Sequence, residues 1–306
     1  MGRSIVGGEQ GGILVLDKPE GITSARVAAR IKKLLLPRKI GHTGTLDPFA
    51  TGVLVLCLNE ATRAADQIAK LNKVYQATVH FGVETDTLDR TGKVIRQSDL
   101  AFAEKDLMEV LRTFSGVCLQ TVPRFSAVKV GGRPLYELSR KGIEVERPER
   151  QICIHSIVLK SFKWPAALIE VCCSKGTYIR QLASDIGQKL ECGAHLSALR
   201  RSSVGPFTLE RALRMDEATS DLSAAAAIIS LNEALSHLPA ALMQDQECLD
   251  RLKNGQLDPQ WEKEQNESFS GCPETVRIVT GTNRLAALWW PNSALNGSRR
   301  LRIFPF

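Results

Sequence analysis

The segment GHTGTLDPFATGVL, residues 41–54, is the most informative part of this chain of 306 residues. It places one carboxylate, Asp47, in a tight loop between glycines and the apolar run that begins at Val53. Glycine permits positive φ and a close approach of the backbone to a ligand, and the proline after Asp47 holds that aspartate extended. A lone Gly-x-Leu-Asp-Pro would indicate an ordinary turn. The longer segment, with its His-Thr pair, instead predicts a functional loop around one acidic side chain.

This segment resembles the catalytic motif of the TruB-type pseudouridine synthases, bacterial enzymes that isomerise uridine-55 in tRNA. Four further regions resemble motifs of the same family and occur in the expected order. They are GILVLDKP with GITS (residues 12–19 and 21–24), KVYQA (73–77), KGTYIR with DIG (175–180 and 185–187), and GAHL with LRR (193–196 and 199–201). Together the five motifs extend over some two hundred residues of the chain, so the resemblance does not depend on any single motif.

The resemblance implies three catalytic residues, namely Asp47 as the essential group, Arg180 as its partner and Tyr75 beside them. A guanidinium near Asp47 would keep the carboxylate ionised, as a nucleophile or a base must be. Arg180 falls in the first turn of a predicted helix, where the helix dipole disfavours a cation, and a carboxylate opposite would account for this placement. Tyr75 is expected on a strand, where it could stack on a flipped base. Without the resemblance, a core-facing tyrosine on the strand would be a serious alternative for Tyr75.

The resemblance also implies a larger set of residues that bind the RNA substrate. The counterpart of His42 enters the space that the flipped nucleotide leaves, although a histidine beside a nucleophile also suits a general base. Asp89 resembles an aspartate that supports the active-site tyrosine or the RNA, and it equally suits a turn cap. Lys18 could contact phosphate or shape the loop. The remaining expected contacts are Tyr178 and Leu199 in the uracil pocket, Arg63 at a phosphate, and Lys129 and Arg133 in a basic insertion.

The charge distribution agrees with a polyanionic partner. Lys and Arg number 40 against 33 Asp and Glu, which gives a formal net charge of +7, a modest excess compatible with nucleic acid. Residues 241–306 carry eight basic and eight acidic side chains, whereas residues 121–150 carry seven basic side chains and four glutamates. This second stretch resembles the RNA-binding insertion of the family, although a charged stretch alone would indicate a solvated loop. The resemblance to the family implies that this partner is the T-arm stem-loop of tRNA.

The hydrophobic pattern predicts an α+β fold with a mixed, mostly antiparallel sheet flanked by helices. Strands are expected from Ile13, Val53, Val74, Ile152 and Ala167, and a helix capped by Thr23 or Ser24 is expected to extend to Leu35. We divide the chain into a catalytic domain, residues 1–240, with its insertion around 121–150, and a C-terminal domain, residues 241–306. Short predicted strands in the latter resemble a PUA-like β-barrel that binds RNA.

The expected reaction changes no oxidation state, and no Cys/His pattern of a metal site is present, so we expect neither a cofactor nor a metal. No apolar run approaches the ~20 residues needed to cross a bilayer, and we expect a cytoplasmic monomer without an obligate protein partner. Three alternatives stay open: a non-catalytic RNA-binding protein on the same fold, a metal-dependent phosphoesterase, and a member of a box RNA–protein complex. The sequence also leaves open whether Asp47 attacks uracil C6, attacks ribose C1′ or takes part in an elimination at C2′.

Overall fold

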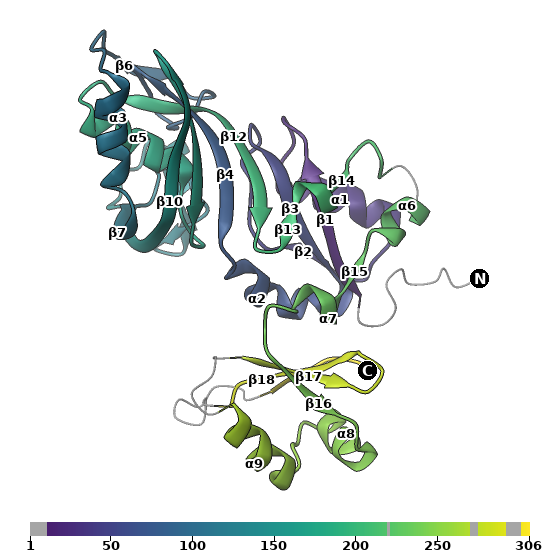
Figure 1. Cartoon of the computed structure of the whole chain (residues 1–306). Helices are drawn as coiled ribbons and strands as arrows, with labels where there is room; N and C mark the ends of the chain where they lie inside the picture. The colour runs from purple at the N-terminus through teal and green to yellow at the C-terminus, as the bar shows by residue number, and fades with distance from the viewer. Residues whose placement is uncertain (1–10, 219–220, 270–274, 292–300) are drawn as a thin grey trace.

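The computed structural model describes residues 11–218, 221–269, 275–291 and 301–306 (Figure 1). The chain forms a large part built on one sheet and a small C-terminal part built on a second sheet. In Figure 1 the small part lies next to the end of the large part that carries α2 (Ala65–Ala69) and α7 (Leu231–Ala234).

The large sheet contains 11 of the described strands. Its main path runs β14-β1-β3-β12-β4-β11-β10-β7, while β2, β13 and β15 pair with β3, β12 and β1. Among these described strands only the β1–β14 and β3–β12 pairs are parallel, so the predicted mixed, mostly antiparallel sheet is confirmed. The strands are β1 (Gly12–Lys18), β2 (Ile40–His42), β3 (Thr51–Leu58), β4 (Lys73–Phe81), β7 (Gly116–Thr121), β10 (Glu149–Lys163), β11 (Ala166–Cys173), β12 (Ala194–Val204), β13 (Phe207–Thr208), β14 (Leu213–Arg214) and β15 (Ile229–Ser230).

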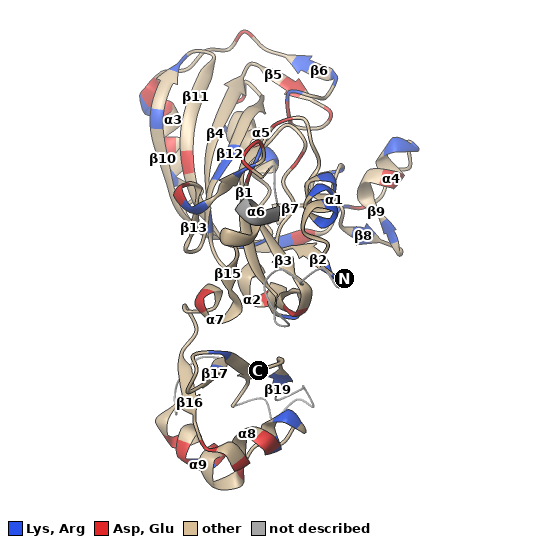
Figure 2. Ribbon diagram, turned by 90° about the vertical axis from the view of Figure 1, so that its right-hand side faces the viewer, with Lys and Arg blue, Asp and Glu red and all other residues tan. Residues whose placement is uncertain are grey.

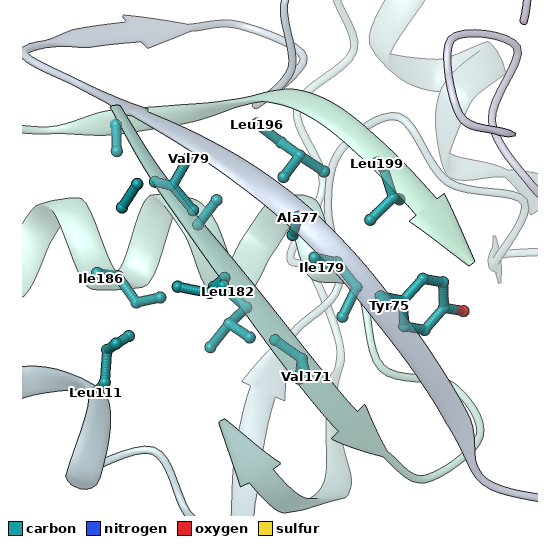
Figure 3. Packing of buried hydrophobic residues seen from close by; sticks show 14 of the residues in the cluster. Tyr75, Ala77, Val79, Leu111, Val171, Ile179, Leu182, Ile186, Leu196 and Leu199 are labelled. Carbon is teal, nitrogen blue, oxygen red and sulfur yellow. The ribbon is translucent and has the colours of Figure 1, made fainter. Parts of the chain in front are cut away.

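Helices pack on this sheet because their apolar residues recur every three or four positions. The predicted helix α1 (Ser24–Leu35) is confirmed: the Thr23 side chain caps it by accepting from the Arg26 N–H, and Val27 and Ile31 are buried against β1 and β3. On the other half of the sheet, α3 (Glu104–Arg112) and α5 (Ile179–Lys189) cover β4. Figure 3 shows Leu111 of α3 and Leu182 of α5 packed in one cluster with the inward-facing residues of β4.

Short elements complete the large part. They are the 3₁₀ helices η1 (Asn59–Ala64) and η2 (Leu209–Arg211), the hairpins β5 (Val83–Thr85) with β6 (Val94–Gln97) and β8 (Lys129–Val130) with β9 (Arg133–Pro134), and the helices α4 (Leu135–Arg140) and α6 (Asp221–Ala226). Figure 2 shows β8, β9 and α4 projecting sideways from the sheet, on the opposite side of the molecule from α3.

Strand β12 is the main element that the sequence pattern does not predict. It pairs with β3 on one side and β4 on the other, at the centre of the sheet. Its sequence, AHLSALRRSSV, carries two arginines and three serines, whereas strands buried on both faces usually appear as apolar runs. One of these arginines, Arg201, is 2% exposed, so the strand is central in spite of its polar composition.

The C-terminal part is an open four-stranded sheet with two helices. Its described strands are β16 (Ala240–Met243), β17 (Val276–Thr280), β18 (Leu285–Trp289) and β19 (Leu301–Ile303), in that order across the sheet. The helices α8 (Gln246–Lys253) and α9 (Pro259–Ser268) begin at the capping residues Asp245 and Asp258. The predicted closed barrel is not confirmed, because β16 and β19 form the two edges of this sheet and do not pair with each other in the described residues.

The two parts contact one another through apolar and polar groups. Leu285, Leu288 and Phe304 of the C-terminal part belong to the same buried cluster as Ile13 and Val53 of the large sheet. The Arg302 guanidinium also lies 2.7 Å from the Asp66 carboxylate. The contact therefore has an apolar centre with charged groups beside it.

Candidate active site

The loop between β2 and β3 carries Asp47, and surrounding elements hold it in place. The Gly21 N–H donates to the Pro48 carbonyl at 2.8 Å, and the Leu46 N–H donates to the Ser24 hydroxyl at 2.9 Å. Gly52, the second residue of β3, has φ +103°, and a Cβ there would lie 2.2 Å from the Arg201 carbonyl oxygen. Only glycine fits this position, because the backbones approach too closely for a side chain.

Arg180 faces Asp47 from the first turn of α5. Its Nε lies 2.9 Å from Oδ2 of Asp47. Its Nη1 donates to the Thr87 carbonyl at 3.0 Å, and its Nη2 donates to the Phe125 carbonyl at 3.1 Å. The side chain of Arg180 is 6% exposed and that of Asp47 is 35% exposed, so the pair has a buried cation and a carboxylate that solvent reaches.

Burial raises the pKa of the Asp47 carboxyl above its ordinary value. The Arg180 guanidinium opposes this rise, and so does the ammonium of Lys18, whereas Asp89 adds to it. The carboxyl therefore gains a proton at a higher pH than a solvated aspartate, in spite of its ion pair. Arg180 is the main group that favours the ionised form.

Asp89 is buried beside the same guanidinium. Its Oδ2 lies 3.5 Å from Arg180 Nη1, and its Oδ1 accepts from the Thr87 hydroxyl and the Thr91 N–H, both at 2.9 Å. The residue therefore caps its own turn and also faces Arg180. It is 4% exposed, which leaves it little surface for direct contact with RNA.

Tyr75 and Leu199 lie on neighbouring strands next to the loop. Across the β4–β12 pair, Leu199 is opposite Ala77 and Arg201 is opposite Tyr75. Tyr75 is 8% exposed and Leu199 is 7% exposed. Figure 3 shows Tyr75 at the end of the apolar cluster, with its hydroxyl directed away from the apolar side chains.

Tyr178 precedes α5, and its backbone is held by a residue that the sequence analysis missed. The Gln120 side chain, from β7, donates to the Tyr178 carbonyl at 3.0 Å and accepts from the Tyr178 N–H at 2.8 Å. Gln120 is 4% exposed. This double contact fixes the start of α5, and therefore fixes the position from which Arg180 extends.

Lys18 is fully buried, and its geometry favours the loop-shaping role over a phosphate contact. Its Nζ donates to the carbonyls of Pro19, Ile22 and Pro48 at 2.9, 2.8 and 3.3 Å. An ammonium has three N–H donors, so this arrangement leaves none for a phosphate. Burial lowers the pKa of Lys18 to about 8, and its contact with Pro48 links it to the Asp47 loop.

His42 ends β2 and lies close to the same loop. Burial lowers its pKa, and Arg201 adds to this effect. Its Nδ1 is buried without a hydrogen-bond partner in the described residues. At neutral pH the ring is therefore uncharged, which suits stacking on bases as well as it suits proton acceptance.

The other expected RNA contacts are Arg63, Lys129 and Arg133, and none of these described side chains forms an ion pair with Asp47. Arg63 follows the far end of β3, where it pairs with Glu60 at 3.1 Å and lies over the Phe304 ring. A strand of eight residues spans roughly 26 Å at about 3.3 Å per residue, so Arg63 is not brought into the group around Asp47. Lys129 and Arg133 are exposed on the β8–β9 hairpin.

Arg201 is the second residue that the sequence analysis missed. The LRR motif places two arginines in succession, and successive residues of a strand point to opposite faces. If these residues formed a strand, one of the two arginines therefore had to face the interior. This alternation was the sequence feature that could have indicated a buried arginine. In the structure Arg200 pairs with Asp17 at 2.7 Å and is partly exposed, whereas Arg201 is buried.

Two absences hold for the part of the chain that the structure describes, residues 11–218, 221–269, 275–291 and 301–306. No group of three or more His, Cys, Asp or Glu in it is arranged to hold a metal ion. No helix in it is both long and apolar enough to cross a membrane.

Comparisons with known proteins agree on one family. Residues 32–179 match the TruB family pseudouridylate synthase (N terminal domain), and residues 180–242 match the tRNA pseudouridylate synthase B C-terminal domain. The tRNA pseudouridine synthase B of Syntrophobacter fumaroxidans is 52% identical over 300 residues, which cover 97% of this chain and 98% of that protein. The enzyme of the same name from Geobacter sulfurreducens is 41% identical over 96% of this chain and 99% of its own length.

Solved structures give a more distant match. A crystal structure of a Cbf5-Nop10-Gar1 complex is similar with a TM-score of 0.72 and 26% identity, and the match covers 99% of this chain and 87% of that one. An H/ACA RNP bound to a substrate RNA containing 2′-deoxyuridine matches with a TM-score of 0.68 and 26% identity, over 92% of this chain and 78% of that one.

Proposed function

This chain belongs to the TruB family of pseudouridylate synthases, and we infer from this membership that it isomerises uridine to pseudouridine in tRNA. We further propose that the target is uridine-55 in the T-loop and that Asp47 is the catalytic carboxylate. The observation that carries the proposal is the ion pair between Asp47 and the buried Arg180, inside the motifs that define the resemblance.

Pseudouridine formation breaks a C–N bond between uracil and ribose and rejoins the base through carbon. Asp47 acts at this bond, either as a nucleophile at uracil C6 or ribose C1′ or as the base of an elimination at C2′. Each of these steps needs the ionised carboxylate, which the Arg180 guanidinium favours. The chemistry needs no redox partner and no Lewis acid, so we propose that the enzyme works without a cofactor or a metal.

The uridine must leave its stack before Asp47 can reach it, and this flipping costs a few kcal/mol. We propose that Tyr75 and Leu199 form the walls against which the flipped uracil packs, with Tyr178 close by. The uncharged His42 ring would fill the space left in the RNA and so offset part of the cost. Lys18 and Asp89 support the site from within, through Pro48 and Arg180 respectively.

Affinity comes from surfaces away from the chemistry. We propose that residues 121–150, including Lys129 and Arg133, bind phosphates of the T-arm, since such contacts hold nucleic acid without reading its sequence. Arg63 would contact a phosphate farther along the same RNA. We also propose that residues 1–240 form the catalytic domain and that residues 241–306 act as a PUA-like RNA-binding domain. The enzyme is expected to act as a cytoplasmic monomer.

The test uses purified protein and unmodified tRNA transcripts with no added cofactor. Pseudouridine is mapped at single-nucleotide resolution in whole tRNA, in an isolated T-arm hairpin and in an unstructured strand of the same sequence. The proposal predicts modification at position 55 in the first two substrates and none in the third, because a loop that already splays the base lowers the flipping cost. Tight binding without any modification would instead favour the non-catalytic RNA-binding alternative. Efficient modification of tRNA but not of the hairpin would show that recognition depends on distant parts of tRNA.

A further inference from the structure

Arg201 is a buried cation with no carboxylate partner among the described residues. It is 2% exposed, and none of the described Asp or Glu side chains forms an ion pair with it within 4.0 Å. Its Nε donates to the Val53 carbonyl at 2.7 Å, and its Nη2 donates to the Gly44 carbonyl at 3.0 Å. Burying an unpaired charge is costly, so a purely structural position would be served better by an apolar residue.

The register of the sheet places Arg201 directly opposite Tyr75. The two residues pair across β12 and β4, and residues that lie opposite one another on antiparallel strands share a face and contact each other. Both are buried, and Leu199, two positions before Arg201, lies on the same face. The guanidinium and the phenol therefore belong to the same side of the sheet as the Asp47 loop.

The direction of hydrogen bonding follows from the chemistry of the two groups. A guanidinium has five N–H donors and no acceptor, and the carbonyls of Val53 and Gly44 use two of them. Any hydrogen bond between Arg201 and Tyr75 must therefore run from the arginine to the phenol oxygen. The hydrogen of the phenol is then free to point elsewhere, and Figure 3 shows this hydroxyl directed away from the apolar cluster.

We propose that Arg201 is a positioning residue for the isomerisation: it donates an N–H to the Tyr75 oxygen, directs the phenol O–H toward the flipped uridine, and holds the turn at Gly44 that leads to Asp47. One buried cation thus fixes two parts of the site, the tyrosine and the loop. This proposal rests on the proposed function, since it assumes that Tyr75 faces the uridine.

Electrostatic effects at Tyr75 agree with this arrangement. Burial raises the pKa of Tyr75, and the positive charge of the nearby Arg201 opposes the rise. The other groups that act on the phenol are Cys173 of β11 and the Asp47 carboxylate, and both raise the pKa further. Arg201 is therefore the group that lowers the pKa of this tyrosine.

The first test measures Tyr75 in the protein without RNA. The chain has three tyrosines, Tyr75, Tyr136 and Tyr178, so a sample labelled with ¹³C at tyrosine Cζ gives three resonances, and Tyr75→Phe identifies one of them. Arg201→Lys is expected to move the titration of Tyr75 to higher pH. The matched control is Arg200→Lys, which changes the adjacent, partly exposed arginine and should leave that titration where it is. An unmoved Tyr75 titration in Arg201→Lys would overturn the proposal.

The second test is a double-mutant cycle measured as the single-turnover rate at saturating tRNA. Arg201→Lys should reduce the rate by about tenfold or more in the Tyr75 protein and much less in the Tyr75→Phe protein, because coupled residues are not additive. The Kd for tRNA should change little. Equal rate losses in both backgrounds would mean that Arg201 acts through the Gly44 turn alone, which contradicts the proposal.

A third measurement keeps the proposal testable if Arg201→Lys does not fold. In the wild-type protein labelled with ¹⁵N-arginine, a nuclear Overhauser effect is expected between the Tyr75 ring and arginine side-chain N–H protons, and its absence would contradict the contact. The spectra need no RNA, so they separate this proposal from the proposed function. The wild-type protein could show the Overhauser effect at Tyr75 and the Arg201→Lys variant the shifted titration, while tRNA stays unmodified. That result would refute the proposed function and leave the contact between Arg201 and Tyr75 supported.

Discussion

Two regions of the molecule contribute to one reaction in opposite ways. One is the loop that carries Asp47, and the other is the basic insertion, residues 121–150. Several neighbouring elements hold the loop in place, including the buried Lys18 and Arg201. The insertion projects from the sheet (Figure 2), and its basic side chains Lys129 and Arg133 are exposed. Rigid, buried polar groups cost no reorganisation when charge develops during a reaction, whereas exposed cations attract a polyanion from a distance.

The contrast indicates that the two regions respond to different experimental changes. Changes around Asp47 should alter the rate of conversion of bound RNA and leave binding largely intact. Changes in the insertion should alter affinity and its dependence on salt, and leave the conversion of bound RNA largely intact. The predictions below test this division.

The largest expected effect is that of Asp47→Asn. The amide is nearly isosteric, but it neither attacks as a carboxylate nor accepts a proton at neutral pH, so isomerisation should be abolished. Binding of tRNA should stay within roughly tenfold, about 1.4 kcal/mol. Pseudouridine mapping and a binding titration on the same preparation measure both. Turnover by the pure variant, with deamidation excluded, would remove Asp47 from its assigned role.

A smaller effect is expected from replacing Lys129, Arg133, Arg140 and Lys141 by Ala. Each lost phosphate contact should lower the slope of log affinity against log salt by about 0.7 to 0.9. The matched control replaces Lys105 and Arg112, exposed basic residues of α3 on the other side of the molecule in Figure 2. A salt slope that is unchanged by the four substitutions would show that the insertion is an ordinary solvated loop.

A moderate effect is expected of pH on the rate of isomerisation. Activity requires ionised Asp47, whose pKa is raised by burial, so the rate should fall with decreasing pH at values above those of a solvated aspartate. Arg180 lowers this pKa. In Arg180→Lys the looser ion pair should therefore move the acid limb of the single-turnover rate to still higher pH. An acid limb that stays in place would mean that it reports a different group.

The smallest expected effect is that of a chelator. The reaction as proposed involves no Lewis acid, so excess chelator should leave the rate on a T-arm hairpin unchanged, provided that monovalent salt keeps the RNA folded. Loss of activity that one particular divalent ion restores, while other ions that fold RNA do not, would reopen the metal-dependent alternative.

The sequence predicts the apolar strands of this fold and its capped helix better than it predicts the polar strand at the centre of the sheet. Apolar runs and the capping Thr23 predict β1, β3, β4 and α1 within a few residues. Strand β12 is missed, because its polar residues hide its position between two strands. In the C-terminal part the strands β17, β18 and β19 are predicted and β16 is not. The barrel is not confirmed, since short strands do not specify whether a sheet closes.

The candidate site shows a similar limit. Motif resemblance points to Asp47 and Arg180, and the structure brings them together at 2.9 Å. Motif resemblance gives no reason to select Gln120. The role of this residue depends on its side-chain amide, which forms two hydrogen bonds with the Tyr178 backbone. Local sequence also does not show that Lys18 is buried, because a lysine beside a proline turn normally lies in water. Such roles depend on contacts between distant segments.

One measurement tests the division of labour most directly: the single-turnover conversion of a T-arm hairpin at saturating enzyme, compared among the wild-type protein, Asp47→Asn and the fourfold Ala variant of the insertion. The account predicts no conversion by Asp47→Asn, and a rate within about tenfold of wild type for the fourfold variant once it is saturated. Conversion by Asp47→Asn, or a fourfold variant that binds fully and does not convert, would contradict it.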